Sequence, residues 1–177
     1  VNIPVLVAGK LEKPHLAEQV LKDGKADAIT IGRAILADPE YVNKIKTNRW
    51  NEVKPCIGCH IGCLGRIFNG LNLSCTVNPA AANERVHKLV LTTEPKNVMV
   101  IGGGLGGMEA ALVAQNRGHK VSLYEANSEL GGAFIPASKF DFKAMDRKLI
   151  HWYKQEIKKA GVEVHLNTKV DEALVDE

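Results

Sequence analysis

The stretch Asn97-Val-Met-Val-Ile-Gly-Gly-Gly-Leu-Gly-Gly-Met-Glu-Ala-Ala111 decides the fold of the second half of this chain. An apolar run leads into Gly102, Gly104 and Gly107, which fit the pattern G-x-G-x-x-G. In this pattern the first glycine permits a tight turn, the second lets a pyrophosphate approach the backbone, and the third lets the next helix pack against the strand. The stretch therefore predicts a strand at 97–101 and a dinucleotide bound at the turn that follows it.

The residues after the turn supply the context that this motif needs. They predict a helix from about 107 to 117 that ends near Gly118, and a second strand at 120–124. Glu125 ends that strand, where a carboxylate accepts hydrogen bonds from the ribose hydroxyls of adenosine. The same carboxylate would repel a 2′-phosphate, so the pattern argues against NADP at this turn.

The rest of this half predicts further parts of the same α/β fold. The pair Gly131–Gly132 would let the chain pass close to the pyrophosphate, and a plain turn is the alternative. Alternating apolar residues predict a half-buried third strand at 162–166. An amphipathic helix is predicted from apolar residues that recur every four positions: Met145, Leu149, Tyr153 and Ile157.

All four cysteines of the chain fall in one window, with the spacing C-x2-C-x3-C-x11-C. Cys56, Cys59 and Cys63 belong to one glycine-containing loop, and Cys75 arrives from a separate turn. Four thiolates at such spacing suit an iron–sulfur cluster, above all [4Fe–4S]. We therefore predict these four cysteines as metal ligands.

Three other readings of the cysteines stay open behind the cluster. A structural zinc site usually shows two C-x2-C pairs, whereas here three cysteines are followed by one. The segment Cys56–His60 also spells the C-x-x-C-H of c-type haem attachment, which would leave Cys63 and Cys75 without a role. Disulfides are the least favoured, because no secretory signal is visible.

The first 50 residues predict the order strand, helix, strand, helix. The strands are expected at 4–8 and 26–32, the first helix at 12–22, and a second helix with Asp38 as N-cap and Pro39 at its first position. Each strand runs into a glycine and a basic residue, Gly9-Lys10 and Gly32-Arg33. In (β/α)8 barrels the loops after strands 7 and 8 commonly bind phosphate, and a simple turn is the other reading.

Composition narrows the function classes. A chain of 177 residues with 45% hydrophobic and 24% charged residues is ordinary for a globular protein. Its net charge of +3 is small and its basic residues are scattered, which argues against nucleic acid, and no apolar run approaches the length of a membrane span. Thiolates that must stay reduced favour the cytoplasm. The first residues read as a strand already in progress, without an initiator Met, so we expect a fragment of a longer polypeptide.

Taken together, these motifs resemble the family of 2,4-dienoyl-CoA reductase, enoate reductase and NADH:flavin oxidoreductase, with the amine dehydrogenases more distant. The matching segments are Ile31–Pro39, the cysteine pattern, Cys75–Pro79, Gly102–Ala111, and Glu125 with Gly131–Gly132. The resemblance implies an α/β chain of three parts. These are the last two β/α units of an FMN-binding (β/α)8 TIM barrel at 1–50, an iron–sulfur loop and linker at 51–96, and the start of a Rossmann-like FAD-binding domain at 97–177.

The resemblance also implies cofactors and contacts. FMN phosphate is expected at Ala8, Gly9, Gly32 and Arg33, the [4Fe–4S] cluster at the four cysteines, and FAD at Gly102, Gly104, Gly107, Glu125, Gly132, Lys139 and Val170. Ala133 stands where relatives often carry Gln, which puts that contact in doubt.

The function implied is that of an oxidoreductase that passes electrons from NAD(P)H through FAD and the cluster to FMN, for reduction of an activated C=C bond in a small unsaturated substrate. We identify no acid/base pair, so we name no catalytic residue and expect the chain alone to be inactive. The substrate, the choice of NADH or NADPH, and assembly as a homo-oligomer stay open. The alternatives are a dinucleotide-binding module with a structural zinc loop, and a nicotinamide dinucleotide in place of FAD.

Overall fold

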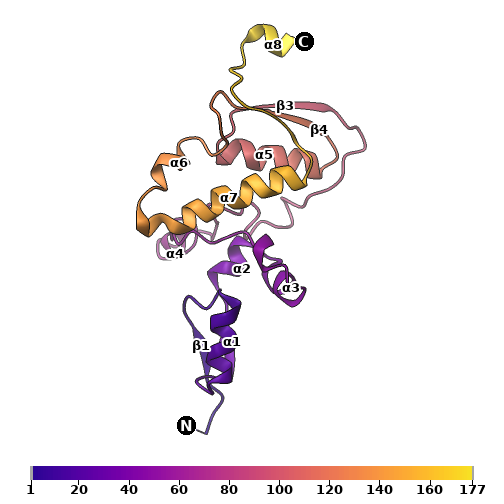
Figure 1. Cartoon of the computed structure of the whole chain (residues 1–177). Helices are drawn as coiled ribbons and strands as arrows, with labels where there is room; N and C mark the ends of the chain where they lie inside the picture. The colour runs from indigo at the N-terminus through magenta and orange to yellow at the C-terminus, as the bar shows by residue number, and fades with distance from the viewer. Residues whose placement is uncertain (1, 177) are drawn as a thin grey trace. The chain divides into compact units, whose positions relative to one another are not determined.

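The computed structural model describes residues 2–176 (Figure 1). They form two compact units that divide between Val86 and His87, inside the segment 51–96 that the sequence analysis assigns to the cluster loop and linker. Each unit is α/β and has its own parallel sheet. Within the described residues, no helix combines the length and the apolar character that a membrane crossing requires.

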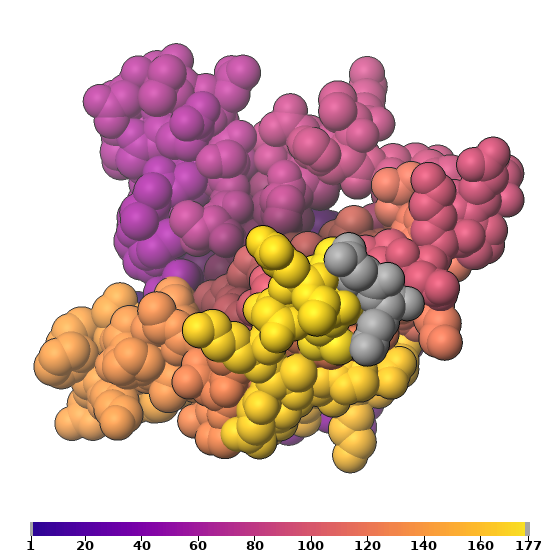
Figure 2. All heavy atoms as spheres, turned by 90° about the horizontal axis from the view of Figure 1, so that it is seen from above, coloured from indigo at the N-terminus to yellow at the C-terminus, as the bar shows by residue number. Residues whose placement is uncertain are grey.

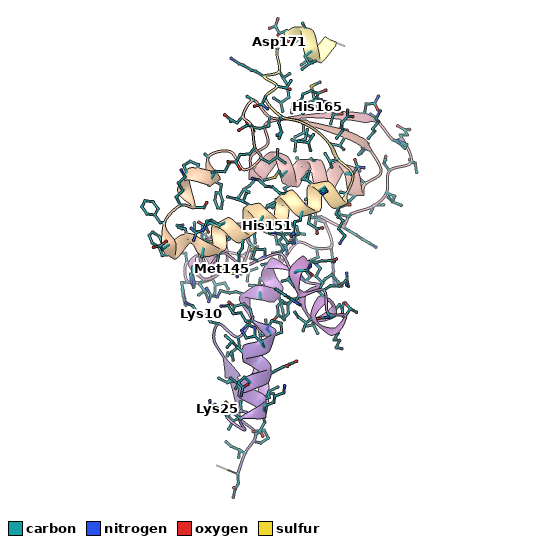
Figure 3. All side chains as sticks on the ribbon, viewed as in Figure 1. Lys10, Lys25, Met145, His151, His165 and Asp171 are labelled. Atoms are coloured by element: carbon teal, nitrogen blue, oxygen red, sulfur yellow. The ribbon has the colours of Figure 1, made fainter. Side chains whose placement is uncertain are left out.

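The first unit begins with a parallel β-pair. β1 (Leu6–Ala8) and β2 (Ala28–Thr30) are joined by α1 (Pro14–Lys22), and Ala8 lies opposite Thr30. The order strand, helix, strand is the one predicted. Figure 3 shows Lys10 and Lys25 at opposite ends of this pair. Because the strands are parallel, the loops that carry Gly9 and Gly32 leave from the same edge of the pair.

The segment after β2 differs from the prediction. A short helix α2 (Arg33–Ala37) comes first, and α3 (Tyr41–Lys46) begins later than expected. Asp38 is extended, with φ −140° and ψ 99°, because Pro39 disfavours helical geometry at the residue before it. A helix does follow Asp38, but it begins at Tyr41 with Glu40 as its N-cap, so the expectation of Asp38 as N-cap and Pro39 as first residue is wrong by two positions.

Asp38 is instead the centre of a buried polar network. Its carboxylate accepts hydrogen bonds from the Glu40 N–H at 3.0 Å, the Lys54 N–H at 2.8 Å and the Lys44 ammonium at 2.7 Å. Its side chain is only 5% exposed, and Lys44 also donates to the Glu52 carbonyl at 3.1 Å. The network therefore fixes the chain at Lys54, just ahead of the first cysteine. Two short helices complete this unit, η1 (Trp50–Glu52) and α4 (Leu64–Ile67).

The second unit is built on three parallel strands in the order β3-β4-β5. The strands are β3 (Asn97–Ile101), β4 (Lys120–Tyr124) and β5 (Glu163–His165). The helices are α5 (Leu105–Asn116), α6 (Phe134–Ala137), η2 (Asp141–Lys143), α7 (Ala144–Lys159) and α8 (Glu172–Asp176). Figure 1 shows α5 and α7 side by side along the sheet, and Figure 2 shows the α8 segment, in yellow, on the surface.

One face of this sheet forms the core. Val121 and Leu123 of β4 are almost fully buried with Met108 of α5, whereas Ile101 of β3 is 62% exposed. The predicted strands at 97–101 and 120–124 are confirmed, and the first helix begins at Leu105 rather than Gly107. The amphipathic helix is also confirmed, because Leu149, Tyr153 and Ile157 are buried in α7.

Candidate functional site

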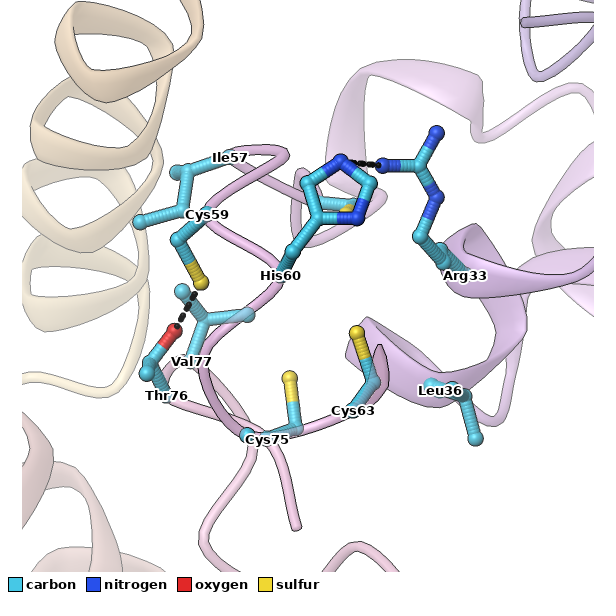
Figure 4. Close-up of a pocket in the computed structure, with 11 residues that line it drawn as sticks. Arg33, Leu36, Ile57, Cys59, His60, Cys63, Cys75, Thr76 and Val77 are labelled. Carbon is cyan, nitrogen blue, oxygen red and sulfur yellow. Dashed lines mark hydrogen bonds between the residues drawn. The ribbon is translucent and has the colours of Figure 1, made fainter. Parts of the chain in front are cut away.

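All four cysteines line one open hollow in the first unit. They are free thiols. Figure 4 shows the Sγ atoms of Cys59, Cys63 and Cys75 directed into the space that these residues surround. The structure thus brings together the four residues that the sequence analysis predicts as ligands.

A close backbone contact brings Cys75 to the other cysteines. The Ser74 N–H donates to the Gly62 carbonyl at 2.7 Å. A Cβ atom on Gly62 would lie 2.7 Å from the Ser74 carbonyl oxygen and 3.0 Å from the Cα of Cys75. Only glycine permits this approach, so the glycine between Cys59 and Cys63 helps to place the fourth thiol. The sequence analysis did not assign this role to Gly62, although the glycine next to Cys63 was a signal for it.

The spacing of the donor atoms bears on the kind of metal. Four sulfur ligands around one zinc ion, each about 2.3 Å from it, would lie only about 3.8 Å from one another. Among residues 2–176, no group of three or more Cys, His, Asp or Glu side chains is arranged to hold a single metal ion. The arrangement of three cysteines in one loop and a fourth from a separate turn is the observation that favours an iron–sulfur cluster over zinc.

The hollow has its own electrostatics. Burial raises the pKa of the Cys56 thiol, while a hydrogen bond from the Gly58 backbone and the charge of Arg33 act in the opposite direction. Arg33 Nη1 lies 2.8 Å from His60 Nε2. A guanidinium can only donate, so His60 accepts at Nε2 and carries its proton on Nδ1. Arg33 is predicted to bind a flavin phosphate, and it also lines the hollow that the cysteines surround.

The other residues predicted to bind FMN lie at the end of the β-pair. Ala8, the last residue of β1, and Gly9 after it are exposed, and Gly32 is exposed just before α2. They share one edge with Arg33, whose guanidinium has further N–H groups besides the one at His60. This edge fits an anion, and binding of FMN there remains a prediction.

The glycine turn of the second unit has the predicted geometry. A Cβ on Gly107 would lie 1.9 Å from the Gly102 carbonyl oxygen, so helix and strand meet at van der Waals contact. A Cβ on Gly104, the N-cap of α5, would meet no heavy atom within 4 Å, which leaves space for a ligand. Gly131 donates to the Gly103 carbonyl at 2.8 Å, and a Cβ on Gly132 would lie 3.1 Å from the Gly104 Cα. The second glycine pair therefore lies against the first turn.

Two predicted FAD contacts lie further along the chain. Lys139 is exposed after α6, and Val170 is half-buried between β5 and α8. Their roles remain predictions.

Glu125 makes contacts that the sequence analysis did not foresee. It is 6% exposed, and its Oε2 accepts the Gly103 N–H at 2.7 Å. Its Oε1 accepts the Asn127 N–H at 2.8 Å and the Asn127 Nδ2 at 2.6 Å. The sequence signal that could have predicted this turn is an Asn two positions after the carboxylate that ends the strand. Glu125 thus holds the glycine turn in place, whether or not a ribose is bound.

These hydrogen bonds make the stability of the second unit depend on pH. The Asn127 N–H, followed by the Gly103 N–H, lowers the pKa of Glu125 from its usual 4.5, although burial opposes them. A carboxylate with a depressed pKa contributes stability above pH 4.5 that is lost as the pH falls through the lower folded value. We expect Glu125→Gln to cost about 1.5–3 kcal/mol near neutral pH and much less near pH 3.

Thermal unfolding of wild type and Glu125→Gln between pH 3 and 7 checks this expectation. Glu163→Gln, at a carboxylate that is 56% exposed, is the control and should change little. A wild-type advantage over Glu125→Gln that stays constant across this range would contradict the role given to the carboxylate.

Two family patterns match the chain. Residues 80–177 match the pyridine nucleotide-disulphide oxidoreductases, and residues 1–52 match the NADH:flavin oxidoreductase / NADH oxidase family.

Individual relatives agree. The chain is 43% identical over 177 residues to a cinnamate reductase of Clostridium sporogenes, covering 100% of this chain and 27% of that protein. It is 43% identical over 173 residues to an NADH oxidase of Thermoanaerobacter brockii, covering 97% of this chain and 27% of that protein. The solved structure of a 2-naphthoyl-CoA reductase superposes with a TM-score of 0.88 at 28% identity, over 99% of this chain and 27% of the other. The chain therefore spans about a quarter of the length of these relatives.

Proposed function

The chain belongs to the NADH:flavin oxidoreductase family, with a pyridine nucleotide-disulphide oxidoreductase domain in its second half, and we propose that it forms the electron-relay centre of an iron–sulfur flavoprotein reductase. The family implies FMN, FAD and a [4Fe–4S] cluster, the three cofactors expected from the sequence. When bound, they supply one- and two-electron chemistry between NAD(P)H and an activated C=C bond. The observation that carries the proposal is the convergence of four free thiols on one hollow.

In the first unit, this chain's residues would hold two of the cofactors. Cys56, Cys59, Cys63 and Cys75 would hold the cluster, and the edge formed by Ala8, Gly9, Gly32 and Arg33 would bind the phosphate of FMN. We take residues 1–50 as the last two β/α units of a (β/α)8 barrel and 51–96 as the cluster loop and linker. The parallel pairing of β1 and β2 through α1 supports this assignment.

In the second unit, where we take residues 97–177 as the start of the FAD-binding domain, the glycine turn would hold FAD. The N-terminal amides of α5 would face the diphosphate at Gly102, Gly104 and Gly107, with Gly132 beside them, and Lys139 and Val170 would complete the contacts. Glu125 orients the Gly103 amide within this turn. Its carboxylate also accepts hydrogen bonds from Asn127, and we propose that a ribose hydroxyl binds beside these donors.

We assign no catalytic acid or base to this chain. Its residues bind and orient cofactors, while NAD(P)H and a small unsaturated substrate belong to the proposed activity of the protein that contains it. A reducing compartment, the cytoplasm, suits cysteines that must remain thiolates.

Metal and flavin analysis of the anaerobically purified protein that contains this chain tests the proposal. We expect about four iron atoms and as much acid-labile sulfide, together with two flavins, one as FMN and one as FAD. Cys59→Ser should remove most of the iron, because a serine hydroxyl is a poor replacement for a thiolate in such a cage. Stoichiometric zinc without sulfide would support the binding-module alternative, and a bound nicotinamide dinucleotide without FAD would overturn the flavin assignment.

A further inference from the structure

Thr76 contacts a predicted cluster ligand directly. Its Oγ1 lies 3.1 Å from the Sγ of Cys59, and the two residues are neighbours in the lining of the hollow (Figure 4). Because Thr76 directly follows Cys75, this contact joins the first group of cysteines to the last one.

The neighbours of Thr76 hold it in this position. Val77 is only 3% exposed, and Asn78 donates from Nδ2 to the Leu36 carbonyl of α2 at 2.8 Å. The backbone that carries Thr76 is thus anchored on its C-terminal side, and the hydrogen bond between Ser74 and Gly62 anchors it on the other. The side chain itself is exposed, so it contributes little to the core.

We propose that Thr76 is a positioning residue that sets the reduction potential of the cluster, an inference that rests on the proposed function. A thiolate ligand can only accept, so the hydroxyl donates its hydrogen bond to the Cys59 sulfur. Hydrogen bonds to the sulfurs are among the factors that set the potential of iron–sulfur clusters. Uptake of one electron makes the site more negative, so the hydrogen bond stabilises the reduced state more than the oxidised one.

Other polar groups of the hollow are placed differently. His60 Nε2 accepts from Arg33, and Arg33 is oriented towards that imidazole. Thr76 is therefore the hydroxyl that acts on Cys59, and its removal should change the potential without changing which residues ligate iron.

The test compares Thr76→Val, Thr76→Ala and Thr76→Ser in the anaerobically purified protein with its cofactors. Iron and acid-labile sulfide are measured first. The cluster is then titrated at controlled potential with dithionite, which dissociates to a one-electron donor, the sulfur dioxide radical anion, and is followed by electron paramagnetic resonance. We expect full iron in all three variants. The ratio of reduced to oxidised cluster at a fixed potential should fall by roughly threefold or more in the Val and Ala variants, as expected for one lost hydrogen bond, and stay near wild type in Ser.

The outcomes separate the inference from its premise. Wild-type protein without iron would overturn the proposed function itself. Full iron with an unchanged potential in both Val and Ala would overturn the role of Thr76 alone. If one of these two variants loses iron, the other decides. Ala is smaller than Thr, whereas Val is similar to it in size. A shift in reduction potential that both variants share is therefore caused by loss of the hydroxyl and not by a change in side-chain volume.

Discussion

Replacing Gly107 with alanine is expected to abolish flavin binding at the second unit and to destabilise that unit by about 3 kcal/mol. The added Cβ would lie 1.9 Å from the Gly102 carbonyl oxygen, a backbone atom with little room to move. The Gly102 N–H donates to the Tyr124 carbonyl at 2.8 Å. Moving the Gly102 carbonyl therefore disturbs both β3 and β4. Relief of the clash must separate α5 from the turn, and the amides that would face the diphosphate lose their alignment.

Gly106→Ala is the matched control for this change. Its Cβ meets no heavy atom within 4 Å, and alanine favours a helix over glycine by up to about 1 kcal/mol. The measurements are the FAD released per protein and the midpoint of thermal unfolding. Gly107→Ala protein with full FAD and a wild-type midpoint would show that the turn does not depend on this contact.

The second unit could be predicted closely because its signals are local. The apolar runs of β3 and β4 and the glycines between them depend on residues near in sequence, and each element lies within a few residues of its expected place. The spacing of apolar residues along the helix is also a local signal, and it correctly predicted that Leu149 and Ile157 are buried. The family resemblance drawn from these motifs is confirmed by both family matches.

The predictions that were wrong or incomplete concern residues whose hydrogen-bond partners are distant in the sequence. Asp38 has the residue type of an N-cap and accepts the Glu40 N–H, but the Lys54 N–H also reaches it, and the helix begins only at Tyr41. Glu125 was predicted to contact a ribose, yet most of its acceptor capacity is used by Gly103 and Asn127. A sequence shows which carboxylate ends a strand, but not which donors reach it first.

The cysteine spacing predicted the kind of site, but not how the chain closes it. Spacing alone shows that Cys75 comes from a separate turn, whereas the bond from Ser74 to Gly62 shows what holds that turn in place. The contact between Arg33 and His60 was equally invisible, because the residues belong to different predicted segments. Substitutions at these contacts can test the site while all four cysteines are kept.

Replacing Gly62 with alanine should therefore remove the cluster while leaving all four cysteines in the chain. The new Cβ would lie 2.7 Å from the Ser74 carbonyl oxygen and 2.9 Å from its carbon, which are backbone atoms, so the segment carrying Cys75 has to move away. The bond from the Ser74 N–H is lost with it. With the fourth thiol displaced, we expect iron and acid-labile sulfide to fall to roughly a tenth of wild type, because cluster binding depends on a preformed ligand set.

Gly65→Ala is a milder change in the same region and serves as the comparison. Its Cβ would lie 3.1 Å from the His60 carbonyl oxygen, a contact that a shift of a few tenths of an ångström relieves, so we expect only a partial loss of iron. FAD content should be unchanged in both variants, since the glycine turn belongs to the other unit. Equal iron in wild type and Gly62→Ala would mean that Cys75 reaches the hollow without the close approach at Gly62, and that the thiols are positioned by contacts other than this one.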